Sequence, residues 1–455
     1  MPTAYTILFL LLILVAAATW IIPAGSYDYV DGVPVAGTYH TVEQNPQGVG
    51  DVLKAAFSGF YDAVDVCIFI LMVGGFLGVV MKTGAVDAGV GNVIRLLGGR
   101  EKWLIPILML LFGLGGTTYG MWEETMAFYP LLIPVFLAAG YDAVVGISVI
   151  LLGAGAGVIA SPVNPFAPGI AAGFAGVSLG EGIVLRLLEW VAFEAAAIWF
   201  VMAYAAKVKK NPSKSVVGVG AGKIQVSMDQ QVPFTAKRKV IMALFTLTFL
   251  IMVYAVVPFD EMGLSLPALG WWFPELSALF LVAGVVIGLI DRMSEEELVE
   301  TYVAGCADLL GVAFIIGISR GITVLMNDGA ITDTVLHWGE QALSGAGAIS
   351  FTLLVFALYL PLTILIPSSS GLATLSIPIV APLGKFAGVG GDLVVTAFQS
   401  ASGLVNIITP TAAVVMGALA LGHVPYDRWV KYVWKLILWF LLLALAFLVA
   451  GVLLG

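Results

Sequence analysis

The sequence predicts an all-α polytopic membrane protein with two inverted repeats, each containing a re-entrant helical hairpin and a broken transmembrane helix. Of the 455 residues, 60% are hydrophobic and 11% are charged, whereas soluble chains are about 45 to 50% apolar and about 25% charged. Long apolar segments recur along the chain, and its two halves carry similar landmarks in the same order. This composition excludes a soluble multidomain enzyme, a disordered scaffold, a nucleic-acid binder and a disulfide-stabilised secreted domain.

Nine apolar segments are long enough to cross the bilayer, because a spanning helix needs about 20 apolar residues. They are 4–22, 62–82, 143–175, 180–206, 238–257, 273–291, 303–326, 392–420 and 428–454. Two further stretches, 103–139 and 348–388, each have two shorter apolar halves around a polar middle that is rich in Gly or Ser. Each of these two stretches predicts either a re-entrant hairpin or a pair of short spans.

Basic residues orient these spans, since cytoplasmic loops are enriched in Lys and Arg. With a cytoplasmic N-terminus, 16 of the 20 basic residues lie in cytoplasmic segments and the C-terminus is external. We therefore expect a multi-pass protein of the cell (inner) membrane, with the lipid bilayer as its surroundings. The expected parts are an N-terminal anchor helix with an external loop (1–50), a first repeat (51–206), a cytoplasmic linker (207–237), connecting scaffold helices (238–293) and a second repeat (294–455).

The two repeats are recognised from landmarks that recur after a nearly constant 245 to 248 residues. The pairs are 59–62 with 305–308, 80–86 with 325–331, the amphipathic segments 86–98 with 331–343, and 161–165 with 409–411. The first repeat begins outside the membrane and the second begins inside. They therefore have opposite orientations, as the repeats of many transporters do.

Four interruptions of helix at membrane depth predict the binding site, because such backbone must be buried in protein or line a water-filled cavity. Their prolines free carbonyls that can ligate a cation, and helix N-termini attract anions. The alternative is that these prolines and serines only kink packed helices. The candidate substrate ligands are Thr117, Thr118, Glu123, Glu124, Asn164, Ser368, Ser369, Ser370, Asn406 and Thr409. The candidate coupling-ion ligands are Ser161, Asn164, Thr409 and Thr411.

Glu123 and Glu124 are the most informative candidates, since an intramembrane carboxylate costs several kcal/mol unless it is paired, protonated or hydrated. Adjacent residues of a helix diverge by about 100°, so we expect one to face the cavity and the other a structural partner. The carboxylate in the cavity would bind a substrate ammonium or guanidinium, ligate sodium or carry a proton. The structural alternatives are a salt bridge to Arg320 or Arg186 and a position in water at the hairpin mouth.

The charge balance and the missing motifs narrow the function. No Lys or Arg lies within the four interruptions, which favours a cationic or zwitterionic substrate over a dianion. The sequence has no phosphate-binding loop, no HExxH zinc motif and no GxSxG nucleophile elbow, so we expect neither ATP hydrolysis nor another enzymatic activity. Transport would be driven by a gradient or by exchange. No cofactor and no metal site is expected, apart from sodium or a proton as the coupling ion.

Four motifs resemble the YfcC-type family, which is related to the anaerobic four-carbon dicarboxylate carriers and to basic amino-acid antiporters within the ion transporter superfamily. They lie at 22–25, 83–85, 123–134 and 161–165, and the resemblance covers essentially the whole chain. It implies a homodimer in which a scaffold part holds a mobile transport part, and the transport part carries the site across the membrane as an elevator.

The resemblance also implies where substrate and coupling ion bind, because hairpin tips and adjacent broken helices hold them in the superfamily. The matching positions here are Thr117, Thr118, Glu123, Asn164, Ser369, Asn406 and Thr409. The Ser-Asn-Thr tip motif of sodium-coupled dicarboxylate members is not present as such. Thr117-Thr118 and Ser368-Ser369-Ser370 stand in its place.

We therefore expect a secondary active transporter, either an exchanger or an ion-coupled carrier, whose substrate is a basic amino acid such as arginine or ornithine. The alternative substrate is a four-carbon dicarboxylate or another carboxylate, coupled to sodium or protons. A channel or a membrane receptor is a third possibility, although channels usually form a symmetric ring across subunits instead of inverted halves.

Overall fold

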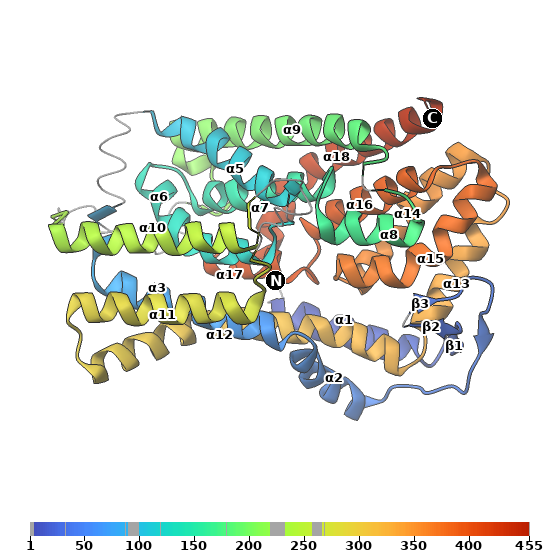
Figure 1. Cartoon of the computed structure of the whole chain (residues 1–455), viewed down its shortest axis with the longest axis horizontal. Coiled ribbons are helices and arrows are strands. Elements are labelled where there is room, and N and C mark those ends of the chain that lie inside the picture. The colour runs from blue at the N-terminus through green and yellow to red at the C-terminus, as the bar shows by residue number, and fades with distance from the viewer. Residues whose placement is uncertain are drawn as a thin grey trace.

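The fold, given by a computed structural model, is almost entirely helical (Figure 1). The structure describes residues 4–31, 33–86, 88–89, 100–118, 120–178, 180–218, 233–256, 266–267 and 269–454. The first predicted amphipathic segment, 86–98, lies mostly outside the described residues. Its partner in the second repeat, 331–343, coincides with helix α13 (Thr332–Leu343).

The described elements follow the chain in this order. The helices are α1 (Ala4–Ala18), α2 (Val49–Asp62), α3 (Val64–Lys82), α5 (Leu104–Thr118), α6 (Tyr129–Ala138), α7 (Ala143–Ile159), α8 (Ala171–Ala175), α9 (Ile183–Lys210), α10 (Ala236–Val256), α11 (Phe273–Asp291), α12 (Glu295–Asp328), α13, α14 (Ala348–Leu365), α15 (Ser369–Ala387), α16 (Gly391–Asn406), α17 (Ala413–Leu421) and α18 (Tyr426–Leu454). Short helical segments are η1 (Glu101–Trp103), η2 (Glu123–Phe128), η3 (Pro165–Ile170) and η4 (Pro212–Lys214). Strand β1 (Gly25–Ser26) pairs with β4 (His40–Thr41), and β2 (Tyr29–Val30) pairs with β3 (Val33–Pro34).

The helices identify an integral membrane protein. Within the described ranges, six helices are long and apolar enough to cross a membrane, namely α3, α11, α12, α14, α15 and α18. The predicted spans 180–206 and 238–257 coincide with α9 and α10. The two split stretches form helix pairs, α5 with α6 and α14 with α15, and these pairs lie in opposite halves of the molecule (Figure 1). Each stretch therefore forms two helices joined at its polar middle, as the sequence predicts.

The inverted repeat is visible in the element boundaries. The starting residues of corresponding elements differ by 243 to 248 residues: 49 and 295, 104 and 348, 123 and 369, 143 and 391, 165 and 413, and 183 and 426. The repeats differ at one point, because α2 and α3 are separate helices that meet at Ala63, whereas α12 continues through the equivalent position. The sequence prediction of one span over 62–82 missed that α2 precedes it as its own helix.

Close backbone contact holds α2 on α12. Gly59 lies so near α12 that an added Cβ would be 2.1 Å from the carbonyl oxygen of Gly317 and 2.5 Å from the amide nitrogen of Gly321. Small residues four apart allow helices in a membrane to approach closely and to pack by van der Waals contact. Gly59 thus fixes the position of the α2–α3 junction relative to α12.

A segment between α1 and α2 forms a strap over α13. The Tyr27 amide donates to Asp333 (3.0 Å) and the Tyr27 hydroxyl to Glu340 (2.8 Å), while Tyr39 stacks on His337 with ring centroids 4.0 Å apart. Burial, and then the hydrogen bond to Glu340, raises the pKa of Tyr27 well above its usual range. Its phenol therefore remains a donor, and the strap stays attached to α13.

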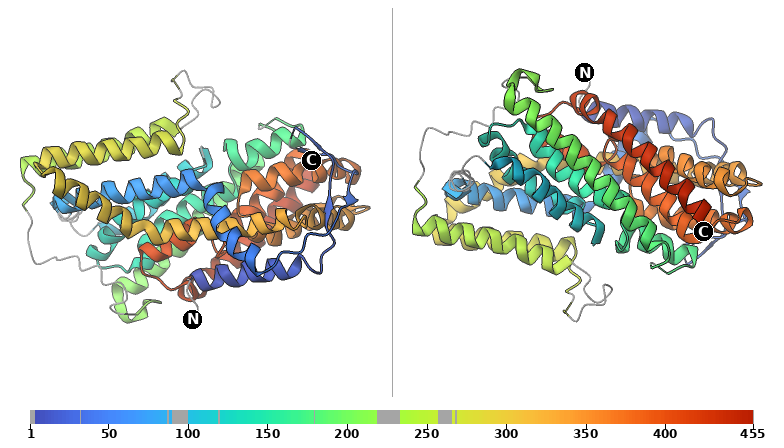
Figure 2. Two further views of the ribbon diagram at one scale, coloured as in Figure 1. Left: turned by 90° about the horizontal axis from the view of Figure 1, so that it is seen from below. Right: turned by 90° about the horizontal axis from the view of Figure 1, so that it is seen from above.

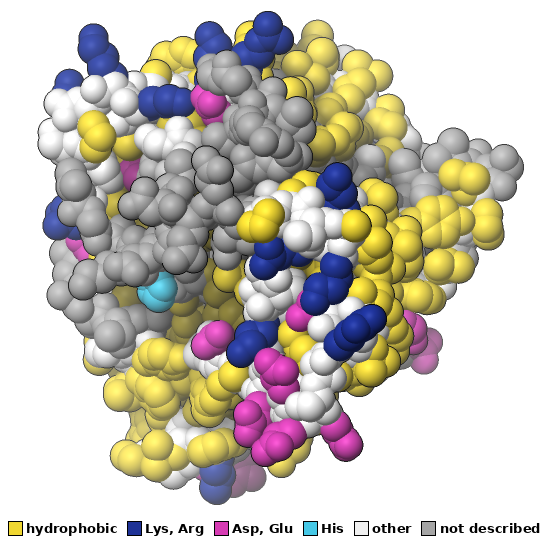
Figure 3. Space-filling view, turned by 90° about the vertical axis from the view of Figure 1, so that its left-hand side faces the viewer, with side chains coloured by type: hydrophobic (Ala, Val, Ile, Leu, Met, Phe, Trp, Pro, Cys, Tyr) yellow, Lys and Arg dark blue, Asp and Glu magenta, His cyan; other side chains and the backbone are white. Residues whose placement is uncertain are grey.

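Basic and acidic side chains gather together at one end of the long axis (Figure 3). Figure 3 views the end where Lys and Arg side chains gather among Asp and Glu, and the ion pairs Lys82–Glu297 (3.7 Å), Lys209–Glu101 (3.0 Å) and Lys237–Asp291 (2.6 Å) lie at helix ends that meet there. The C-terminus and the strap lie at the opposite end (Figures 1 and 2).

Replacing Gly59 with alanine is predicted to destabilise the protein. The methyl group must push α2 away from α12, and overpacking of this kind costs about 1 to 3 kcal/mol. The melting temperature in detergent, followed by fluorescence-detected size exclusion, should fall. Gly50→Ala is the matched control in the same helix, since an added Cβ there meets nothing within 4 Å. Equal melting temperatures for the two variants would contradict the prediction.

Candidate functional site

The tip of the second hairpin joins α14 to α15 through Ile366, Pro367 and Ser368. Pro367 has no amide donor and disfavours helix in the residue before it, which ends α14. Ser368 then caps α15, with its hydroxyl accepting a hydrogen bond from the Gly371 amide (3.2 Å). The serines at 368–370 therefore lie at a helix N-terminus, where exposed amides and the helix dipole favour negative charge.

The tip of the first hairpin is shaped by Gly120 and η2. Gly120 has φ of +76°, and an added Cβ would be 2.8 Å from the side chain of Asn164. The chain turns there and enters η2 at Glu123. The Trp122 amide donates to Glu124 (3.1 Å), which satisfies an amide that the start of a helix leaves free.

The break after α7 is bound to this first hairpin. Ser161 donates from its hydroxyl to the Thr117 carbonyl (2.6 Å) and accepts from the Asn164 amide (2.9 Å). The Asn164 side chain donates to the Gly116 carbonyl (3.4 Å) and accepts from the Phe166 amide (2.8 Å). These hydrogen bonds attach the irregular backbone of 160–164 to α5 and satisfy polar groups at the break within the protein.

The break after α16 has its own internal contacts. The hydroxyls of Thr409 and Thr411 are hydrogen-bonded to each other (2.9 Å), and the Thr411 carbonyl accepts from the hydroxyl of Ser319 in α12. Both threonines are buried. The Asn406 side-chain oxygen, also buried, has no hydrogen-bond partner in the described part of the chain.

The two tips and the two breaks meet at a cavity of about 210 Å³. Seven of the ten predicted substrate ligands line it: Glu123, Glu124, Asn164, Ser368, Ser369, Ser370 and Asn406. Thr117, Thr118 and Thr409 are not among its lining residues. The Thr118 hydroxyl donates to the Leu114 carbonyl within its own helix (2.6 Å), so it turns back along α5.

Both Glu123 and Glu124 line the cavity, which corrects the expectation that only one would do so. They begin a 3-10 segment at the tip of the hairpin, where the cavity borders several consecutive residues and not one face of a regular helix. In the described structure, Arg320 does not form a salt bridge with Glu123 or Glu124. Arg320 pairs instead with Asp62, with 3.7 Å between the guanidinium Nε and a carboxylate oxygen.

Further lining residues that the sequence did not predict include Asp62, Asp65, Trp272, Phe273 and Arg320. Asp62 and Asp65 flank the junction of α2 and α3, and Arg320 belongs to α12. The absence of Lys and Arg from the interruptions therefore does not make the site purely acidic. Arg320 could have been identified from sequence as one of two charged residues, with Asp308, inside the predicted span 303–326, because such charges are functional candidates by default.

The candidate coupling-ion ligands lie beside this cavity. Ser161 is buried and hydrogen-bonded, Asn164 lines the cavity, and Thr411 lines a smaller space of about 30 Å³ together with Glu123 and Arg320. In the described residues, no group of three or more His, Cys, Asp or Glu is arranged to hold a metal ion. Hydroxyl, amide and carbonyl oxygens are thus the groups at the breaks that could hold a monovalent cation.

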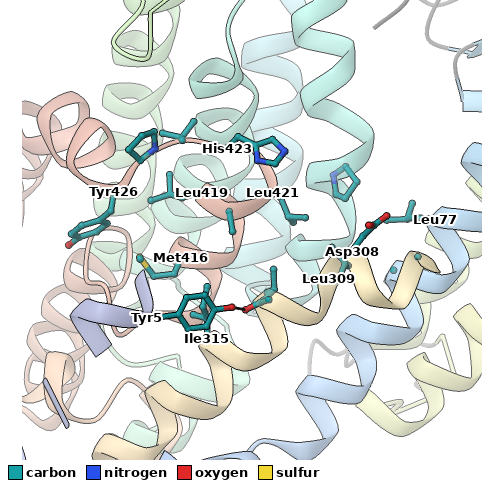
Figure 4. Close-up of a pocket in the computed structure, with 18 of the residues that line it drawn as sticks. Tyr5, Leu77, Asp308, Leu309, Ile315, Met416, Leu419, Leu421, His423 and Tyr426 are labelled. Atoms are coloured by element: carbon teal, nitrogen blue, oxygen red, sulfur yellow. Dashed lines mark hydrogen bonds between the residues drawn. The ribbon is translucent and has the colours of Figure 1, made fainter. Parts of the chain in front are cut away.

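A larger cavity of about 1140 Å³ lies further along α12, and its walls include residues of α3, α17 and α18 (Figure 4). Leu309, Ile315 and Met416 make its lining largely apolar, and Asp308 and His423 bring polar groups to it. The small space near Arg320 lies between the two cavities along α12, and Ala413 and Val414 of α17 also line it. The larger cavity and the small space therefore follow one seam between α12 and α17, and the 210 Å³ cavity adjoins this seam at Arg320.

Known proteins resemble the chain over nearly its whole length. Residues 1–453 match the DcuC family, described as C4-dicarboxylate anaerobic carriers. An uncharacterized protein of Haemophilus influenzae is 35% identical over 503 aligned residues, covering 99% of this chain and 97% of that protein. The "putative basic amino acid antiporter YfcC" of Escherichia coli K12 is 31% identical over 480 aligned residues, covering 95% and 92%. These matches confirm the resemblance seen in the motifs.

Two solved transporter structures are also similar. The YdaH transporter of Alcanivorax borkumensis has a TM-score of 0.43 at 15% identity, with 98% of both chains covered. MtrF of Neisseria gonorrhoeae, from a class of antimetabolite efflux pumps, has a TM-score of 0.42 at 18% identity, with 98% of this chain and 94% of its own covered. Since the family match extends over residues 1–453, the chain belongs to the C4-dicarboxylate anaerobic carrier family of membrane transporters.

Proposed function

We propose that the protein is a secondary active transporter, an exchanger or an ion-coupled carrier, for a basic amino acid such as arginine or ornithine. The observation that carries this proposal is the charge arrangement of the 210 Å³ cavity, where four carboxylates lie around one guanidinium. The carboxylates are Asp62, Asp65, Glu123 and Glu124, and the guanidinium is that of Arg320. A basic amino acid carries the complementary charges, two cations and one anion.

Each charged group of such a substrate has a matching region of the cavity. The α-carboxylate would lie near Arg320 and the N-terminus of α15, where Ser369 and Ser370 offer hydroxyls as well as amides. The α-ammonium and the side-chain cation would lie among the four carboxylates. Trp272 and Phe273 add apolar walls for the aliphatic stem. The volume is below the roughly 300 to 1,000 Å³ typical of sites for drug-sized ligands, which suits a metabolite of amino-acid size.

The proposal includes how the site moves. In the elevator arrangement, the hairpins and broken helices would form the mobile part and would slide along a scaffold that includes α3 and α12. The seam of cavities between α12 and α17 supports such sliding, because loosely filled space along an interface lets one part move past another. A homodimer in the inner membrane, with its N-terminus cytoplasmic and its C-terminus external, completes the arrangement. The coupling ion would be sodium or a proton.

Four-carbon dicarboxylates are the second candidate substrate. Arg320 and the serine-rich N-terminus of α15 together favour an anion, and the family is described by its C4-dicarboxylate carriers. A dicarboxylate would have to bind beside four acidic side chains, several of which would need protons or cations. A basic amino acid brings two cations of its own to these carboxylates, and it is therefore the first proposal.

Neutralising Glu123 or Glu124 is predicted to weaken arginine binding by about tenfold to a hundredfold, as expected when one partner of a desolvated charge pair is lost. The measurement is the shift in melting temperature of the purified Glu123→Gln and Glu124→Gln proteins as arginine is titrated. Glu296→Gln, at an exposed position in the first turn of α12, is the control that should match the unsubstituted protein. If the double variant still binds arginine with full affinity, these glutamates do not recognise the cation.

Substituting Arg320 separates the two candidate substrates. Arg320→Gln is predicted to weaken arginine binding by about tenfold, because the α-carboxylate loses its cationic partner. Agmatine, which is arginine without its α-carboxyl group, should bind the variant as well as it binds the unsubstituted protein. Counterflow of radiolabelled arginine, agmatine and succinate in proteoliposomes provides the comparison. Succinate exchange that disappears in Arg320→Gln, without any exchange of arginine, would replace the first proposal with the second.

A further inference from the structure

One buried carboxyl group has no place in the substrate cavity. Glu194, in the middle of α9, is 3% exposed, and neither of its carboxylate oxygens has a hydrogen-bond partner in the described structure. It does not line any of the cavities along α12. The large majority of buried polar side chains in proteins form hydrogen bonds. A buried carboxyl group without a partner therefore requires an explanation.

In the described part of the chain, the helices that pack against α9 place no charged side chain beside Glu194. α9 packs against α5, α7 and α18, and neither α5 nor α7 contains a titratable side chain. The charged residues of α18 lie in its first turns, up to Lys435, whereas Phe440 is the residue that packs on Phe193 next to Glu194. On α9 itself, Glu189 lies more than one turn earlier and accepts a hydrogen bond from Ser400 (2.8 Å), and Arg186 lies earlier still.

Helix α5 packs closely against the carboxyl group of Glu194. An added Cβ on Gly113 of α5 would be 2.5 Å from a carboxylate oxygen of Glu194 and therefore could not be accommodated without movement. A metal cation would need several oxygen ligands around it, and on the α5 side the carboxyl group meets this glycine. A proton needs only the carboxylate oxygen. A single carboxyl group without further oxygen ligands therefore favours a proton over a metal cation.

We propose that Glu194 is a proton-binding site of the transport cycle, distinct from the substrate cavity. An ionised carboxylate with no cation or donor beside it is strongly unfavourable in such surroundings, and protonation removes that penalty. Glu194 would hold a proton while α5, α7 and α9 are packed as they are here. It would release the proton when a change in their packing admits water. This inference rests on the proposed transport function and names its coupling ion.

Helix α5 connects this acid to the substrate cavity. Gly113 lies against Glu194, and one turn later the carbonyls of Gly116 and Thr117 accept hydrogen bonds from Asn164 and Ser161. Asn164 lines the substrate cavity. A change in how α5 packs on α9 therefore reaches the break that borders the substrate, which gives protonation a route to substrate affinity.

The test uses the purified full chain in proteoliposomes with arginine and with succinate. Glu194→Gln carries a permanently neutral isostere, so substrate counterflow at equal pH should remain within about twofold, whereas accumulation driven by an imposed pH gradient should fall by at least about tenfold. Counterflow also shows that the variant is folded. Glu300→Gln, at an exposed position of α12, is the matched control and should keep both activities. Gradient-driven accumulation by Glu194→Gln at the control's level would overturn the proposal.

Infrared difference spectroscopy tests the site without transport. The unsubstituted protein should show the C=O stretch of a protonated carboxyl group, shifted in D₂O, that is missing from Glu194→Gln and present in Glu300→Gln. An unchanged band in Glu194→Gln would overturn the proposal. If neither arginine nor succinate shows counterflow in the unsubstituted protein, the proposed function fails, while the infrared band still decides whether Glu194 holds a proton.

Discussion

Backbone that leaves a helix at membrane depth must find hydrogen-bond partners within the protein, and the architecture of the site depends on this requirement. After α7, the Ser161 carbonyl accepts from the side-chain amide of Gln399 in α16 (3.0 Å). After α16, the Ile407 carbonyl accepts from the indole of Trp429 in α18 (3.1 Å). Each break is therefore bound to a helix distant in sequence. The same contacts that satisfy the backbone also bring the two breaks to one place.

The two repeats supply opposite charges to the cavity. All four carboxylates come from the first repeat, whereas Arg320 and the serines of the α15 N-terminus come from the second. This difference depends on the point where the repeats diverge, since the junction at Ala63 places Asp62 and Asp65 at the cavity while α12 remains straight. The interface between inverted halves is thus polarised, and a substrate with charge of both signs fits it in one orientation.

The sequence was informative about the fold because its signals are local or periodic. Apolar length and the distribution of Lys and Arg predicted the spans, and the polar middles predicted the hairpin tips. Arg320 was not placed at the site, because only the packing of α12 against α2, α3 and α17 brings it there. The junction at Ala63 contains no proline or glycine and gave no signal. Thr118 was wrongly expected at the cavity, since the direction of a hydroxyl at a helix end depends on the turn that follows.

In the proposed mechanism, the charged residues of the cavity are divided between the mobile part and the scaffold. This division gives a physical reason for the carrier to exchange substrates and not to move empty. In the proposed elevator, Glu123 and Glu124 travel with the hairpins, whereas Asp62, Asp65 and Arg320 remain with α2, α3 and α12. A mobile part that carries two unpaired carboxylates through the membrane meets a cost of several kcal/mol for each. A dicationic substrate removes that cost, and a proton on each glutamate would remove it as well. Movement is therefore tied to occupancy by substrate or by protons, and a carrier whose glutamates stay ionised would cross only when loaded and would exchange one substrate for another.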